Sequence, residues 1–165
     1  MTQTSLLGNI RARLLTLARR LEPIGPTLAR LTVGLVFIGT GWGKLHTLPD
    51  VTEFFASLHI PAPGLNARIA ASTEFFGGIL LLVGLGTRLA ALPMAFTMVI
   101  AILTAKRPEI DGLTTLVGFE EWSYLVFFLW LAVAGAGPLS LDRLVGPHLR
   151  RLLEKKWPTR ETVPA

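Results

Sequence analysis

Two charged side chains stand where the surrounding sequence is otherwise apolar. Glu74 lies about five residues inside one apolar run, and Lys44 ends another. An ionised carboxylate in apolar surroundings is costly unless it is paired or hydrated, so the sequence predicts a Lys44–Glu74 ion pair. Gly77 and Gly78 follow Glu74 at helical spacing and share its helix face. We therefore expect the carboxylate to point between helices.

A second set of polar and aromatic residues lies near the ends of the same runs. With Lys44 and Glu74 as the catalytic pair, we expect this set to form a polar, substrate-binding pocket at one end of the helices. The predicted binding residues are Trp42, His46, Gly77, Gly78, Glu121, Trp122 and Tyr124, with Glu120 beside them. The competing interpretation is structural. In it the ion pair only sets helix register, His46 is a loop residue, and Glu120 and Glu121 are solvated helix-end charges.

Residue types that are missing exclude several chemistries. The chain has no cysteine, which rules out disulfides, thiolate metal sites and iron–sulfur clusters. Its histidines, His46, His59 and His148, are not at the spacing of metal ligands, so we expect no metal and no covalently bound cofactor. The net charge of +5 comes without a nucleic-acid-binding motif, so we expect no nucleic-acid partner.

Four apolar segments carry these residues: 28–45, 69–85, 89–105 and 122–138. Each has about 17 to 18 residues, which is the short end of the range for a membrane-spanning helix. Only 16% of the chain is charged, against roughly 25% in soluble domains. The predicted fold is all-α, an integral membrane four-helix bundle in contact with the lipid bilayer. Residues 46–66 and 106–121 are expected as loops, and Thr87–Arg88 as a tight turn that makes an antiparallel hairpin.

The first residues have a different character. Residues 5–21 alternate leucines and arginines at helical spacing, which predicts a basic amphipathic helix on the membrane surface or against a partner protein. Its arginines interrupt any signal-peptide core, so no cleaved leader is expected. The predicted organisation is an amphipathic cytoplasmic segment at 1–26, the four-helix domain at 27–144, and a basic cytoplasmic tail at 145–165.

The charge distribution predicts the orientation. With four crossings, both termini and Arg88 share one side, and that side holds 12 of the 16 basic residues. Basic residues concentrate on the cytoplasmic side of membrane proteins. We therefore expect a multi-pass protein of the inner membrane with both termini in the cytoplasm.

Small residues in three of the four segments predict close helix packing, because lipid gives no hydrophobic drive for helices to associate. Gly39 and Gly43 have GxxxG spacing in the first segment, with Gly34 and Gly41 nearby. The spacing leaves open whether this GxxxG pair packs within one chain or between two copies in a homo-oligomer.

Three stretches in a fixed order resemble the DoxX family of small bacterial membrane proteins. They are RLTVGLVFIGTGWGKL at 30–45, EFFGGILLLVGLGTRLAA at 74–91 and GAGPLSLDRL at 135–144. The family's Gly-x-x-Lys-Leu element matches Gly41, Lys44 and Leu45. Its other elements match the Glu74 region, the Thr87–Arg88 turn and the Ser140–Asp142 sequence. The resemblance implies a four-helix bacterial membrane fold, in a family whose name comes from a thiosulfate:quinone oxidoreductase subunit.

Three functions follow as hypotheses. The leading one, implied by the resemblance, is a membrane subunit of, or accessory to, a quinone-linked oxidoreductase, with the quinone head near Lys44 and Glu74. The second is a non-enzymatic anchor or assembly partner for a redox or detoxification enzyme. The third, transport of a small solute, is weaker because the last two segments lack the interior charges expected of a proton-coupled pump.

Overall fold

The computed structural model describes residues 12–17, 21 and 23–147, and in that part of the chain it is helical with no strand. The all-α prediction is therefore confirmed. Residues 12–17 are helical and exposed. The rest of the predicted amphipathic helix, apart from Leu21, lies outside the described residues, as do His148 and the tail after it.

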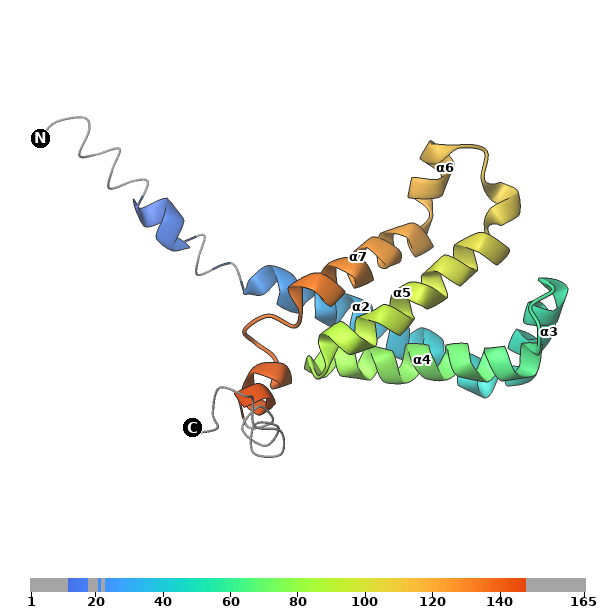
Figure 1. Cartoon of the computed structure of the whole chain (residues 1–165), viewed down its shortest axis with the longest axis horizontal. Helices are drawn as coiled ribbons and strands as arrows, with labels where there is room; N and C mark the ends of the chain where they lie inside the picture. Colours follow the sequence, from blue (N-terminus) through green and yellow to red (C-terminus); the bar gives the residue numbers. More distant parts are fainter. Residues whose placement is uncertain (1–11, 18–20, 22, 148–165) are drawn as a thin grey trace, which may run out of the picture.

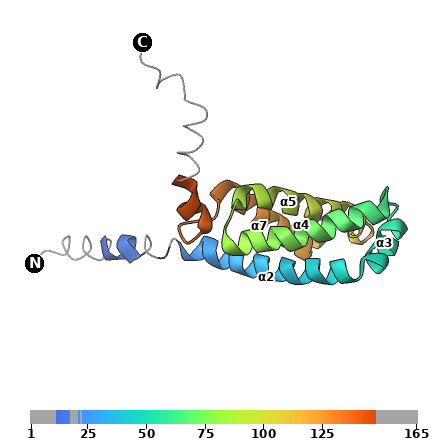
Figure 2. The same ribbon diagram turned by 90° about the horizontal axis from the view of Figure 1, so that it is seen from below.

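The long helices run alongside one another (Figures 1 and 2). The most extensive contacts join α2 to α4 and α5 to α7, and α4 also packs on α5. The elements in chain order are α2 (Ile24–His46), α3 (Leu48–Ser57), α4 (Pro63–Val83), α5 (Thr87–Thr104), the short 3-10 helix η1 (Arg107–Glu109), α6 (Leu113–Gly118) and α7 (Glu120–Ala134).

Three of the described helices, α2, α4 and α5, are long and apolar enough to cross a membrane. Helix α7 has 15 residues, or about 22 Å at 1.5 Å per residue, which is shorter than a hydrocarbon core of about 30 Å. The fourth crossing, and with it the side on which each terminus lies, stays a prediction.

Large apolar side chains cover the outside of the bundle. Leu35, Leu89, Phe96 and Val133 are 62%, 77%, 64% and 80% exposed. A soluble protein rarely leaves so much apolar surface in water, whereas lipid tails solvate it without cost. The exposed surface of the helices therefore suits a bilayer.

Glycines bring α2 and α4 together, as predicted, but not through the GxxxG pair. An ideal Cβ on Gly78 would lie 2.8 Å from the Ile38 nitrogen, and one on Gly34 would lie 3.0 Å from the Gly78 oxygen. An ideal Cβ on Gly39 or on Gly43 would have no such neighbour within 4 Å among the described residues. Helix α2 thus contacts α4 along the face of Gly34 and Gly41, and its GxxxG face is open.

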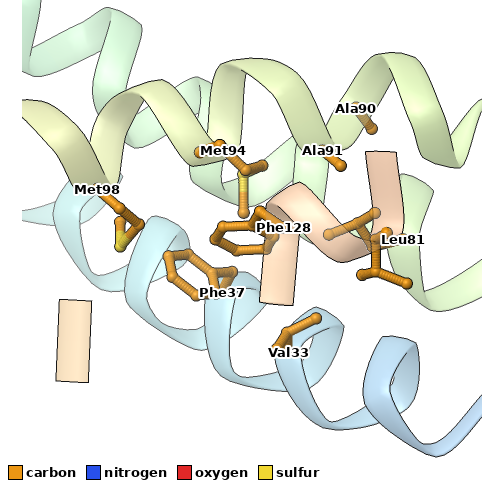
Figure 3. Packing of buried hydrophobic residues seen from close by; sticks show 10 residues of the cluster. Val33, Phe37, Leu81, Ala90, Ala91, Met94, Met98 and Phe128 are labelled. Carbon is orange, nitrogen blue, oxygen red and sulfur yellow. The ribbon is translucent and has the colours of Figure 1, made fainter. Parts of the chain in front are cut away.

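The centre of the bundle is a tightly packed apolar core (Figure 3). Phe37 of α2 makes an edge contact with Phe128 of α7, with 5.0 Å between ring centroids. Met94 of α5 is fully buried, and its sulfur lies 2.6 Å from an ideal Cβ position on Gly77. Met94 thus occupies the space that a side chain on α4 would need.

A glycine turn reverses the chain between α4 and α5, so the predicted antiparallel hairpin is present (Figure 1). Gly84 and Gly86 have φ of 69° and 59°, a left-handed conformation that glycine adopts at little cost. The turn precedes its predicted position, because Thr87 is already the first residue of α5.

Both predicted loops contain helices, and this corrects the sequence analysis. Residues 46–66 include α3, and residues 106–121 include η1 and α6. Helix α4 begins at Pro63, before the apolar run at 69–85, since proline suits the first turn of a helix. Glu74 therefore lies near the middle of α4, roughly 16 Å from its first residue at 1.5 Å per residue.

Candidate functional site

The predicted Lys44–Glu74 ion pair is present between α2 and α4. Lys44 Nζ lies 2.5 Å from Glu74 Oε1, and the two side chains are 37% and 4% exposed. Lysine is therefore the accessible end of the pair, and the carboxylate is the buried end.

Glu74 shares one face of α4 with small and apolar residues. The buried residues of this helix include Ala67, Ala71, Gly78 and Leu81, which are three or four residues apart and so lie along one stripe. Because the stripe is built of small side chains above and below Glu74, α2 comes close enough for Lys44 to reach the carboxylate.

The second carboxylate oxygen of Glu74 differs from the first in its contacts. Glu74 Oε2 is buried and accepts no hydrogen bond among the described residues. An unsatisfied buried polar atom costs about 1–3 kcal/mol, and more when it belongs to a charged group. Such atoms in native structures need a physical explanation, and one explanation is a ligand or a proton.

Three aromatic rings, those of Trp42, His46 and Phe75, lie near one another where α2 contacts α4. The Trp42 ring is 4.1 Å from the His46 ring and 5.7 Å from the Phe75 ring, between centroids. His46 Nδ1 is 2.9 Å from the Trp42 carbonyl oxygen, and Trp42 is 55% exposed. Trp42 and His46, two of the predicted binding residues, therefore lie on α2, the helix that carries Lys44, and on an open surface.

The other predicted binding residues lie elsewhere. Gly77 and Gly78 make the contacts with Met94 and α2 given above. Tyr124 packs edge-on against Phe37, 5.1 Å between ring centroids, and Glu121 lies in the first turn of α7. Trp122 lines a separate groove.

This groove separates the beginning of α2 from α7. It has a volume of about 540 Å³ and is lined mostly by apolar residues: Gly25, Ala29, Trp122, Ser123, Val126, Phe127 and Trp130. It does not include Lys44 or Glu74. The structure thus places Trp122 in a groove apart from the ion pair rather than in one pocket with it.

A polar cluster that the sequence analysis missed ties the opposite end of the bundle together. Arg30 of α2 is 2% exposed, and its Nη2 donates a hydrogen bond of 2.5 Å to the Leu139 carbonyl oxygen. An ideal Cβ on Gly84 would overlap Arg30 Nη1. Arg30 therefore occupies space that only a glycine at the α4–α5 turn leaves open.

Asp142 completes this cluster. Its carboxylate accepts hydrogen bonds from the Gly86 and Thr87 backbone N–H groups, at 2.6 and 3.1 Å, and its own N–H donates to the Gly84 oxygen at 2.9 Å. The carboxylate caps the start of α5, where the helix dipole favours negative charge. The resemblance to the DoxX family includes the Ser140–Asp142 sequence, but the sequence alone does not predict that Asp142 contacts the start of α5.

Comparison with known proteins identifies the family of the chain. The DoxX family model matches residues 25–107. Inner membrane protein YqjF of Escherichia coli is 31% identical over 140 residues, which cover 84% of this chain and 99% of that protein. Inner membrane protein YphA of the same organism is 33% identical over 127 residues, covering 74% of this chain and 91% of that protein.

A third relative carries a functional name. "Putative oxidoreductase CatD" of Bacillus subtilis is 32% identical over 124 residues, covering 74% of this chain and 87% of that protein. The comparison with solved structures gave no significant match. With a family model that covers half of its length and relatives matched over most of theirs, the chain belongs to the DoxX family of membrane proteins.

Proposed function

We propose that the protein is a membrane subunit of, or accessory to, a quinone-linked oxidoreductase system. The observation that carries the proposal is the Lys44–Glu74 pair, in which one carboxylate oxygen is bound by lysine and the other is buried with no hydrogen-bond partner in the described part of the chain. Ionisable groups inside a membrane are costly and are retained mainly where they serve a pathway or a ligand.

The two ends of the pair suit different tasks. A quinone head is a ring with carbonyl oxygens that takes up two electrons and two protons when it is reduced. The more exposed Lys44 ammonium donates a hydrogen bond to such an oxygen. Glu74 balances the lysine charge through Oε1 and can hold a proton at Oε2.

Apolar surfaces for the rest of the molecule lie nearby. The Trp42 and Phe75 rings offer faces for stacking on a flat head group, a geometry that aromatic pairs favour. An isoprenoid tail would lie on the lipid-facing side of the helices. The name of CatD, the Bacillus subtilis relative, is consistent with redox chemistry.

The test is quinone binding by the purified protein in detergent, with analogues that differ only in tail length. We expect saturable, tail-dependent binding that weakens at least about tenfold in Glu74→Gln, the equivalent of roughly 1.4 kcal/mol. Glu109→Gln is the matched control. It removes the carboxylate of a second ion pair, with Lys106 at 3.5 Å, whose acid is 57% exposed.

Two outcomes would contradict the proposal. One is the absence of saturable binding to the wild-type protein. The other is an equal loss of affinity in the Glu74 variant and the Glu109 control, because a specific site cannot respond equally to both.

One observation favours the anchor as a second candidate function. The ion pair joins α2 to α4 directly, and neither of the two cavities described in the structure includes it. Replacing a buried ion pair by apolar residues is often neutral or stabilising. If the protein is an anchor, the Lys44→Met, Glu74→Leu double variant will fold and still co-purify with its partner. If it binds quinone, the same double variant will fold but lose binding.

A further inference from the structure

An open cavity lies at the end of the bundle where the α4–α5 turn meets the chain after α7. Its volume is about 330 Å³, which is within the size range of small-molecule sites. Its lining combines backbone-rich glycine segments with three charged side chains: Gly86, Arg88, Leu89, Ala134, Gly135, Ala136, Gly137, Ser140, Asp142 and Arg143.

The charges of this cavity do not cancel. The Asp142 carboxylate is already engaged by the two N–H groups at the start of α5. Within the described ranges, the ion pairs are Lys44–Glu74 and Lys106–Glu109, so neither Arg88 nor Arg143 has a carboxylate of that part of the chain within 4.0 Å. The cavity is therefore lined by two arginines and one carboxylate, and that carboxylate is already engaged by backbone N–H groups.

The Arg88 side chain lies close to the backbone at the end of α7. Gly135 has φ of 81° and ends α7. An ideal Cβ there would lie 3.1 Å from Arg88 Nε. Because glycine leaves this space, the Arg88 side chain lies against the chain at Gly135, on the wall of the cavity.

The surroundings identify the source of the anion. Leu89, which lines the cavity, is 77% exposed, and Leu144, next to Arg143, is 74% exposed. Exposed leucines in a membrane protein face hydrocarbon, whereas guanidinium groups face head groups or water. The cavity thus has an apolar side and a cationic side, as the boundary between lipid tails and phosphates does.

We propose that this cavity binds the phosphate of an anionic phospholipid between Arg88 and Arg143, with the acyl chains against the exposed leucines. Guanidinium groups suit this task because their forked N–H donors match phosphate oxygens. The proposal is independent of the quinone site, which involves the opposite end of α2. It assigns a specific lipid contact to the end of the bundle that the charge distribution predicts to be cytoplasmic.

The test is a lipid titration of the purified full-length protein in detergent, followed by native mass spectrometry, with phosphatidylglycerol against phosphatidylcholine. We expect the wild-type protein to bind phosphatidylglycerol preferentially. Each arginine near a membrane surface contributes roughly fivefold in affinity, so Arg88→Gln with Arg143→Gln should weaken phosphatidylglycerol binding about 30-fold.

The matched control is Arg68→Gln with Arg107→Gln. Both of these arginines are exposed, and the double variant changes the net charge equally but at the other end of the bundle. We expect it to change the affinity for phosphatidylglycerol less than about twofold, because screening weakens effects beyond a Debye length.

Three results would overturn the proposal. The first is a wild-type protein that binds both lipids equally, which is a measurement that needs no variant to fold. The second is an equal loss of affinity in the two double variants. The third is displacement of phosphatidylglycerol by millimolar inorganic phosphate, which would make the cavity a site for a soluble anion.

Discussion

The contact at Gly41 gives a prediction whose magnitude follows from the structure. An ideal Cβ at Gly41 would overlap the Phe75 nitrogen and lie 2.7 Å from its Cα. Both are backbone atoms, so relief requires α2 and α4 to separate by more than the roughly 0.7 Å that would restore an ordinary 3.4 Å contact at the Cα, because the nitrogen is nearer still. Overpacking of this kind typically costs about 1–3 kcal/mol.

Helix propensity opposes that cost. Alanine is favoured over glycine inside a helix by roughly 0.8–1 kcal/mol. Because the overlap is with backbone atoms, we place the overpacking cost at the upper end of its range; less the propensity gain, Gly41→Ala should lose about 2 kcal/mol of unfolding free energy. Gly39→Ala, on the open face of the same helix, should be neutral or gain up to about 1 kcal/mol.

The assay is unfolding of each variant in mixed micelles by increasing sodium dodecyl sulfate, followed by helical circular dichroism. Gly41→Ala should shift the midpoint to lower denaturant, and Gly39→Ala should not. Similar shifts in the two variants would refute the reasoning, because they would mean that Gly41 does not face α4. An unfolding midpoint that is unchanged in Gly41→Ala would also refute it.

Other contacts give shorter predictions, measured by the same titration unless stated. Asp142→Asn should destabilise the protein by about 1 kcal/mol, because the amide offers only one acceptor oxygen to the Gly86 and Thr87 N–H groups and lacks the negative charge favoured at a helix start. Gly84→Ala should cost more than Asp142→Asn, since it combines a left-handed φ of 69° with overlap on Arg30. Because the chain has no native cysteine, single cysteines at Gly112 and Gly146 can report topology. If four helices cross the membrane, an impermeant thiol reagent should label only the Gly112 variant in intact cells.

The parts of the site that could be predicted were the charged residues that stand out from apolar sequence around them. Glu74 is a lone acid in an apolar run, and Lys44 ends the preceding one. Pairing them required only that the two helices be neighbours. The distance of Glu74 from the start of its helix was underestimated, because hydropathy marks where apolar residues begin, whereas the helix begins at Pro63. A helix can therefore start several residues before its apolar run.

Residues whose role depends on rotation about a helix were less predictable. The aromatic residues of the predicted pocket were grouped by their distance from helix ends, which says nothing about direction. Trp42 and Trp122 lie near the ends of different helices, yet one contacts Phe75 and the other lines a groove with Trp130. For the same reason GxxxG spacing did not reveal that Gly39 faces outward while Gly41 faces α4.

Arg30 shows why a charge count and a contact are different kinds of information. In the sequence it is one of five basic residues before Leu31, and it adds to the predicted cytoplasmic charge. In the structure its side chain is buried and bonded to the Leu139 oxygen. The orientation argument survives without it, because 11 of the remaining 15 basic residues still lie on that side.

The two ends of the bundle are consequently held in different ways. At one end Arg30 and Asp142 join α2, the α4–α5 turn and the chain after α7 through several hydrogen bonds. Toward the other end, the side-chain ion pair that joins α2 to α4 among the described residues is Lys44–Glu74. Lipid supplies no hydrophobic drive between helices, so polar contacts and glycine packing must maintain their register. A ligand that binds Lys44 competes with one contact rather than with a network, and this favours the Lys44 end as the place where binding changes helix contacts.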